Sequence, residues 1–201
     1  MFAKSFFDLC VPQKCLEGNN CQSNLKLLYE FGYRTIAINH EVQDQNTQDD
    51  ADENENKKKK KKSKLKEQNE IIPEPMKIEK TVTEEFEDLT ILKRLTITFS
   101  SRDSFHKILK SENFKKYDIL ALLPTTMSAL MFVCSNVDGD ILTIDPETKS
   151  PLRINRKIYN QLVNKGYFFE ILYSPTIEDY TKRKNTIHIS HLYHTFGKSK
   201  I

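Results

Sequence analysis

The chain has 201 residues, with 31 Lys and Arg against 28 Asp and Glu, and a formal net charge of +3. This length allows one domain, or one domain with an insert, and so small a positive charge says little by itself about an acidic partner. No apolar run approaches the roughly 18 residues of a membrane-spanning helix, and the first residues are charged too early for a secretory signal. We therefore expect a soluble, intracellular protein with no membrane partner.

The four cysteines, Cys10, Cys15, Cys21 and Cys134, show no CxxC spacing. Neither a zinc knuckle nor a redox motif is therefore indicated. We interpret them as reduced thiols that serve as small core residues, and we expect no cofactor and no metal.

The start of the chain predicts a strand, a helix and a second strand. The strands are expected over residues 5–9 and 35–39, and the helix over 23–31, where apolar residues recur at helical spacing. Gly32 is placed to end this helix in the left-handed conformation. The short loop before the second strand is typical of a compact α/β unit.

From residue 41 to residue 90 this alternation disappears. An acidic stretch is followed by the lysine run 57–62, and almost no apolar residue precedes Ile71. Such a segment cannot offset the entropy of ordering, so we predict a disordered insert in a single domain formed by 1–40 and 91–201. The lysine run fits a nuclear localisation signal, a phosphate-binding arm, or a solvated insert with no dedicated task.

Strands and helices alternate again from residue 92. The apolar runs are nearly continuous, as in strands that are buried on both faces of a parallel sheet. Repeated βα units predict an α/β fold of the TIM-barrel type. Strands are expected over 92–99, 118–123, 141–144 and 168–172, and helices from about 101, over 126–134, over 156–164 and over 183–193.

The pattern contains about six βα units, whereas a closed barrel has about eight. Gly197 and the residues after it resemble the turn into a further strand. We therefore expect a barrel truncated at about six of the eight units, with two unpaired strand edges. Such a chain is a fragment, a truncated gene product, or a form that a partner must complete.

Six of these segments, taken in order, resemble the p30 (Rpp30/Rpp1) protein subunit family of ribonuclease P and ribonuclease MRP. The resemblance covers almost the whole chain apart from the insert. It rests on Phe7-Asp8-Leu9, the segment from Gly32 to His40, Leu92 to Ile97, Tyr117 to Ala121, Phe169 to Pro175, and Arg183 to Ile187.

This resemblance implies an eight-unit βα barrel and a non-catalytic protein subunit of a nuclear, nucleolar ribonucleoprotein. In that particle the RNA hydrolyses precursor tRNA to mature its 5′ end, and the MRP relative processes ribosomal RNA precursors. The implied partners are the ribonuclease P or MRP RNA, precursor tRNA within the complex, a Pop5-type protein subunit and other proteins of the complex.

The alternative is an enzyme, because the family's barrel resembles that of the PHP metal-dependent phosphoesterases. A metal site of that kind gathers several His and Asp or Glu side chains at strand ends. Here the strand ends carry Asp8, His40 and Glu170 without a His-x-His arrangement. We expect instead that Asn39 and His40 form hydrogen bonds at the rim of the barrel. A third class is a protein that only binds other proteins, through the open edge after the sixth strand.

Three histidines, His188, His191 and His194, are spaced to lie along one predicted helix. A two-histidine zinc clip is conceivable there, but no carboxylate or cysteine accompanies them locally. A partly exposed helix face explains them better.

Basic residues in loops at the strand ends are the candidates for RNA binding, because guanidinium and ammonium groups neutralise phosphates. Tyr173 and Tyr180 could stack on unpaired bases beside one of these clusters. Arg94 lies within a strand instead, and we expect it to pair with a carboxylate of the barrel. The candidate RNA-binding residues are Lys182, Arg183, Lys184, Arg102, Arg153, Arg156 and Lys157.

Overall fold

The computed structural model describes residues 5–18, 20–43, 71–79, 84–147, 152 and 154–197. Most of the predicted helices and strands are present in these ranges. The strands are β1 (Phe6–Pro12), β2 (Tyr33–Gln43), β3 (Thr90–Phe99), β4 (Ile119–Pro124), β5 (Ile141–Leu142) and β6 (Phe168–Phe169). The helices are α1 (Asn20–Glu30), α3 (Arg102–Leu109), α4 (Met127–Asn136), α5 (Arg156–Asn164), α6 (Ser174–Glu178) and α7 (Tyr180–Gly197), with the 3-10 helices η1 (Gln13–Leu16) and η3 (Glu112–Lys116).

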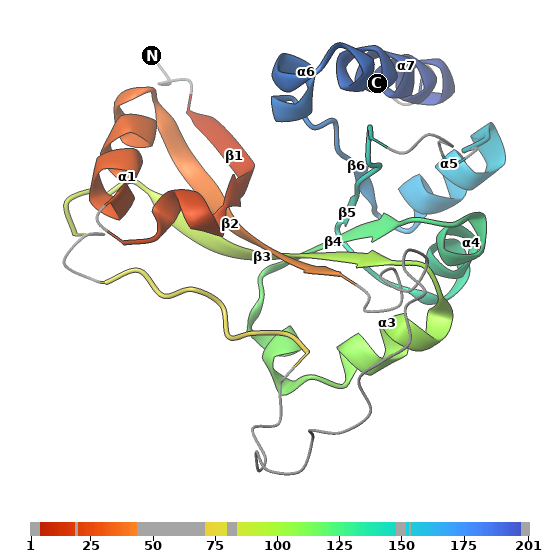
Figure 1. Ribbon diagram of the computed structural model, residues 1–201, viewed down its shortest axis with the longest axis horizontal. Helices are drawn as coiled ribbons and strands as arrows, with labels where there is room; N and C mark the ends of the chain where they lie inside the picture. The colour runs from red at the N-terminus through yellow and green to blue at the C-terminus, as the bar shows by residue number, and fades with distance from the viewer. Residues whose placement is uncertain are drawn as a thin grey trace, which may run out of the picture.

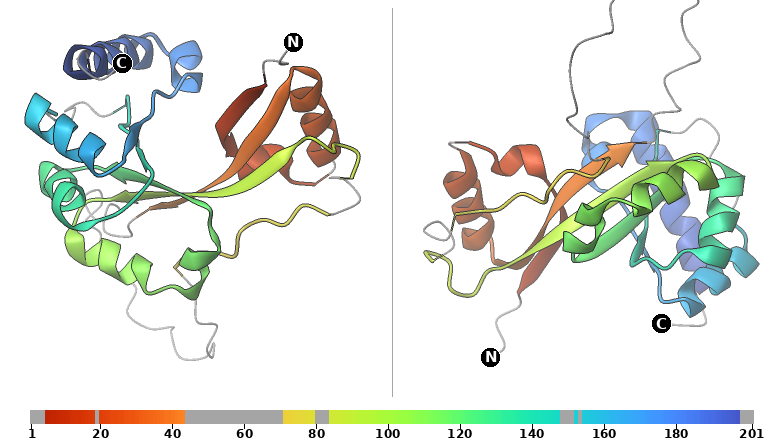
Figure 2. Two further views of the ribbon diagram at one scale, coloured as in Figure 1. Left: turned by 180° about the vertical axis from the view of Figure 1, so that it is seen from behind. Right: turned by 90° about the horizontal axis from the view of Figure 1, so that it is seen from below.

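All six strands belong to one sheet, in the order β1-β2-β3-β4-β5-β6. Every neighbouring pair is parallel. The strand order follows the chain, and helices α3, α4 and α5 lie on the outer side of the curled sheet (Figures 1 and 2). The predicted α/β fold of the TIM-barrel type is confirmed as an open half-barrel.

Short polar side chains begin the outer helices where the sequence predicts helix starts. Ser101 accepts a hydrogen bond from the backbone N–H of Ser104, and Thr126 caps α4 in the same way. Asn155 does so for α5, whose bounds are those predicted. Each cap satisfies one of the backbone N–H groups that a helix leaves unpaired at its start.

Helix α1 ends at Glu30, and Gly32 lies in the turn that follows it, where the sequence predicts the stop. The residue has φ +91°, a conformation that costs little only for a residue without a Cβ. The chain turns there and enters β2 directly.

The apolar residues form two clusters. The larger one packs the outer face of β3–β5 against α3, α4, α5 and α7, and contains Phe99, Phe105, Leu122, Leu130 and Leu162. The smaller cluster joins β1, β2 and α1. Burial of this kind on the helix-covered face is what holds a parallel sheet together.

Several residues of the predicted insert 41–90 belong to the folded domain. Residues 41–43 belong to β2, and the backbone carbonyl of Ile72 accepts a hydrogen bond from Asn113 at 3.0 Å. Ile72 is fully buried in the larger cluster, and Phe86 is buried in the smaller one. These apolar side chains supply the burial that a segment needs in order to be ordered. The lysine run 57–62 lies outside the described residues.

Strands β5 and β6 are shorter than predicted. The predicted strand 168–172 ends at Phe169, and helix α6 begins five residues later. Pro175 lies in the first turn of α6, where its missing N–H costs nothing. No helix in the described ranges is long and apolar enough to cross a membrane.

Candidate functional site

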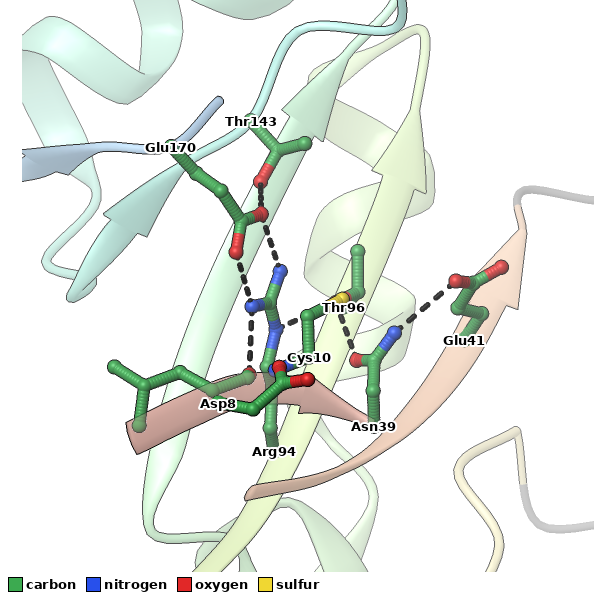
Figure 3. A network of polar contacts seen from close by, with 9 residues as sticks. Asp8, Cys10, Asn39, Glu41, Arg94, Thr96, Thr143 and Glu170 are labelled. Atoms are coloured by element: carbon green, nitrogen blue, oxygen red, sulfur yellow. Dashed lines mark hydrogen bonds and ion pairs between the residues drawn. The ribbon is translucent and has the colours of Figure 1, made fainter. Parts of the chain in front are cut away.

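Arg94, in the middle of β3, points into the interior of the half-barrel and is 1% exposed (Figure 3). Its Nη1 and Nη2 donate to the two carboxylate oxygens of Glu170 at 2.6 and 2.7 Å. Nη1 also donates to the carbonyl of Leu9 at 2.8 Å. The guanidinium therefore ties β1 to the residue directly after β6, across the inside of the sheet. The predicted pairing of Arg94 with a barrel carboxylate is confirmed.

Further hydrogen bonds extend this network along the strand ends. Arg94 Nε donates to Thr96 Oγ1 at 3.1 Å, and Thr96 Oγ1 donates to Asn39 Oδ1 at 2.6 Å. Thr143 Oγ1 donates to the Glu170 carboxylate at 2.7 Å. Since buried polar groups are costly without partners, these mutual bonds stabilise the interior of the sheet.

The expected rim contacts of Asn39 and His40 are also present. Asn39 Nδ2 donates to Glu41 at 3.1 Å. His40 Nδ1 lies 2.7 Å from Gln13 Oε1, an acceptor, so Nδ1 carries the proton. Burial lowers the pKa of His40 below its usual value.

A cavity of about 350 Å³ opens at these strand ends. Threonine hydroxyls line its walls, together with Cys10 and Arg94, and its acidic side chains are Glu41, Asp145 and Glu147. Arg94 is neutralised by Glu170, and Glu147 of the lining pairs with Lys182. None of the candidate RNA-binding residues lines this cavity.

Two strand-end carboxylates that the alternative metal site would need, Asp8 and Glu170, each have a different partner within the protein. Asp8 accepts a hydrogen bond from the backbone N–H of Cys10, and Glu170 is held by Arg94. A positive guanidinium beside Glu170 opposes binding of a cation there. Within the described ranges, no group of three or more His, Cys, Asp and Glu side chains could hold a metal ion.

The predicted cluster 182–184 lies in the first turns of α7 and not in a loop. Lys182 forms ion pairs with Glu147 and Glu178, and its hydrogen bond with Glu147 raises its pKa. Arg183 is exposed, and its Nε donates to the carbonyl of Thr176 at 2.7 Å. Lys184 is exposed as well. Lys182 is therefore partnered by carboxylates, whereas Arg183 and Lys184 face the solvent.

The other candidates lie on different helices. Arg102, on α3, donates through Nε to His106 Nε2 at 3.1 Å. Arg156 and Lys157 are exposed in the first turn of α5, and Arg156 Nη2 lies 3.5 Å from the carbonyl of Thr195 near the end of α7. Arg153 lies outside the described residues. The candidates within the described residues therefore lie on three helices, α3, α5 and α7.

Comparison with known proteins adds the decisive observation. A family model described as "RNase P subunit p30" matches residues 5–200 of this chain. The chain belongs to the ribonuclease P subunit p30 family. The resemblance that the sequence segments indicated is thereby confirmed.

Two p30-family relatives illustrate the similarity. The chain is 30% identical over 166 residues to "Ribonuclease P protein subunit p30" of Mus musculus. The alignment covers 78% of this chain and 53% of the mouse protein. It is 28% identical to "Probable ribonuclease P protein subunit 3" of Schizosaccharomyces pombe, over 90% of this chain and 67% of that protein. This p30-family chain thus spans about half the length of the mouse relative.

A solved structure supports the fold. One chain of an archaeal ribonuclease P, determined by cryo-EM with mature tRNA, superposes with a TM-score of 0.61 at 16% identity and covers 96% of this chain and 69% of that one. At this identity the likeness concerns the architecture of the p30-family chain alone.

Local sequence patterns do not name the partners of Arg94 and Lys182. Glu170 is the only charged residue in the run Phe168–Leu172, and this isolation was the available signal that it meets Arg94. No comparable signal pointed to Glu147 as the partner of Lys182, because they are on segments that only the folded p30-family chain brings together.

Proposed function

We propose that this chain serves as a protein subunit of a ribonuclease P ribonucleoprotein and supports 5′-end maturation of tRNA by binding the catalytic RNA. The single observation that carries the proposal is the match of the p30 family model over residues 5–200. Phosphodiester hydrolysis belongs to the RNA in this proposal, and the protein contributes charge neutralisation and positioning.

The solvent-facing start of α7 is the best-supported RNA contact. Arg183 and Lys184 are exposed there, and Tyr173 and Tyr180 beside them are 74% and 76% exposed. Cationic side chains neutralise phosphates, and exposed tyrosine rings stack on unpaired bases. Lys182 holds this helix start in place through its two carboxylate partners.

A double substitution tests this contact. In Arg183→Ala/Lys184→Ala, we expect weaker binding to ribonuclease P RNA and a salt slope smaller by roughly 1–2, because one or two fewer counterions are released. Binding is measured by filter retention over a series of salt concentrations. A matched control, Lys14→Ala/Lys26→Ala, removes two exposed charges at η1 and α1 and should leave affinity nearly unchanged. An unchanged salt slope in the α7 variant would exclude this surface.

The catalytic assignment has its own test. Purified chain incubated with precursor tRNA and Mg²⁺ should give no 5′ cleavage until the RNA subunit is added. Cleavage by the protein alone, together with bound zinc, manganese or iron detected by elemental analysis, would favour the phosphoesterase alternative.

The finer assignments also form part of this proposal. They are membership in the MRP particle with a role in ribosomal RNA processing, contact with a Pop5-type subunit, and residence in the nucleus and nucleolus. A fluorescent fusion should accumulate in the nucleus and lose that accumulation when lysines 57–62 are replaced by alanine. Retained nuclear accumulation would assign the lysine run another task.

A further inference from the structure

We propose that the exposed face of α7, together with Arg156 of α5, forms one continuous surface that binds the sugar–phosphate backbone of paired RNA. The inference rests on the proposed function and deepens it, because it names the kind of RNA and adds contacts beyond Arg183 and Lys184. The further contact residues that it assigns are Arg156, His191 and His194.

Helix α7 has one side in the core and the other in solvent. Thr186, Ile189 and Tyr193 are buried, and they recur at spacings of three and four residues, as the inner side of a helix requires. The exposed side chains recur with the same period on the opposite side. They are Tyr180, Thr181, Arg183, Lys184, Ile187, His188, His191, His194 and Thr195.

Two rows of basic and imidazole side chains run along this exposed face. Lys184 and His191 are seven residues apart, which is about two turns, so they lie in one row. Arg183 and His194 are eleven residues apart, which is about three turns, and they form the second row. Because α7 contains no Asp or Glu, no carboxylate of the helix interrupts either row.

The carboxylates that contact α7 are engaged away from these rows. Glu147 and Glu178 pair with Lys182, which is only partly exposed. Nine residues separate Lys182 from His191, and at about 3.6 residues per turn this places them on opposite sides of the helix. Asp179 accepts a hydrogen bond from the backbone N–H of Lys182. The exposed face therefore keeps its positive charge.

Arg156 extends this surface at the other end of α7. It is exposed at the start of α5, and its Nη2 lies 3.5 Å from the carbonyl of Thr195. Helix α5 contains no Asp or Glu either. From Lys184 to Thr195 the helix rises about 16 Å. Cationic side chains thus lie at both ends of the surface, and His191 lies between them.

This arrangement fits paired RNA best. Cationic and imidazole groups spaced along a rigid helix can contact successive phosphates, and paired RNA is recognised mainly through its shape, phosphates and 2′-hydroxyls. Sites for single strands offer a series of aromatic side chains for base stacking, whereas the aromatic residue on this exposed face is Tyr180, at its start. An acidic protein would match the charge, but protein interfaces have apolar centres, and the aliphatic residue on this face is Ile187.

Site-directed photocrosslinking from the middle of this face tests the proposal in the assembled particle. p-Azidophenylalanine replaces Ile187, which is 61% exposed, in the full-length chain. Particles are purified through an affinity tag on that chain and irradiated, and the crosslinked nucleotides are mapped by primer extension. We expect crosslinks to base-paired nucleotides. The same probe at Leu27, 50% exposed on α1, is the matched control.

A triple substitution tests the contact residues themselves. Arg156→Ala/His191→Ala/His194→Ala should weaken binding of the chain to a short RNA duplex by about fivefold or more, because phosphate contacts are lost. The unsubstituted chain should bind a single strand of the same length more weakly than the duplex. The control Lys14→Ala/Lys26→Ala should leave duplex affinity nearly unchanged.

The outcomes separate this inference from the proposed function. Particles without ribonuclease P RNA would contradict the proposed function. If the particles contain the RNA, crosslinks from residue 187 only to unpaired nucleotides or to an acidic protein, or none above those from residue 27, would overturn the paired-RNA surface alone. Unchanged duplex affinity in the triple variant would do the same. Circular dichroism melting of each variant confirms that loss of binding is not loss of fold.

Discussion

At the residue scale, Arg94 shows how a full positive charge is tolerated inside the sheet. Burial alone would lower the pKa of Arg94, but the hydrogen bonds with Glu170 and the charge interactions with Cys10, Glu170 and Glu41 together outweigh this and leave the pKa raised. The Glu170 side chain is itself only 15% exposed. Each partner therefore removes the penalty that the other would carry alone.

Breaking this pair should be costly. In Arg94→Met, we expect the free energy of unfolding to fall by about 3–5 kcal/mol, because the Glu170 carboxylate stays buried without its counter-charge. Urea denaturation followed by circular dichroism measures the change. The double variant Arg94→Met/Glu170→Met should lose less than Arg94→Met does. If Arg94→Met lowers the free energy of unfolding by less than about 1 kcal/mol, water takes the place of the guanidinium beside Glu170.

Cys10 and Cys15 should differ in reactivity. Burial raises the pKa of the Cys10 thiol to about 11, whereas Cys15 is exposed. At pH 8 only about one Cys10 thiol in a thousand is a thiolate, and the thiolate is the reactive form. Iodoacetamide labelling followed by peptide mapping should therefore modify Cys15 well before Cys10. Equal labelling rates would show that the strand-end cavity admits solvent freely.

At the element scale, the segment 71–79 belongs to the folded domain although the predicted insert included it. The carbonyl of Ile72 accepts from Asn113, and the carbonyl of Pro73 accepts from the Tyr117 hydroxyl at 3.1 Å. Both donors lie in and just after η3, so the segment supports the connection between α3 and β4.

Removing the buried side chain of this segment tests its role. Ile72→Ala should lower the free energy of unfolding by about 2–5 kcal/mol, the usual loss for a truncated core residue. Lys77→Ala is the control, since its side chain is 75% exposed, and should change stability by no more than about 0.5 kcal/mol. Thermal or urea unfolding gives both values. Equal small effects would show that the segment contributes little to the core.

At the scale of the whole molecule, the sheet is strongest in its middle. β3 pairs with β2 from Thr90 to Thr98 and with β4 from Arg94 to Phe99, whereas β5 and β6 pair over two positions. Edge strands have a neighbour on one side only and so have fewer backbone hydrogen bonds. The contacts of Arg94 with Leu9 and Glu170 offset part of this loss, because they join β1 to the end of β6.

Native-state hydrogen exchange should reproduce this gradient. We expect the slowest amide exchange in β3, from Leu95 to Phe99, and the fastest strand exchange in β6, because local opening of an edge breaks fewer contacts. In Arg94→Met, the amides of β1 and of the segment around Glu170 should lose protection before those of β4. Uniform exchange across the sheet would show that its central strands are no more stable than its edge strands.

The sequence alone was sufficient for the alternation of strands and helices, for the starts of α3, α4 and α5 to within about one residue, and for the turn at Gly32 that follows α1. These features depend on neighbouring residues, whose periodicity, capping and backbone freedom act over a few positions. The family followed from the same short segments.

Only the tertiary structure decided which distant groups meet. Arg94 and Glu170 are 76 positions apart. Lys182 pairs with Glu147, which lies in the connection between β5 and α5. Such pairings depend on the curvature of the sheet and on how each helix packs, so local patterns do not determine them. For the same reason, the sequence could name basic residues as candidates for RNA binding but could not tell that carboxylates already hold Lys182 while Arg183 and Lys184 stay exposed.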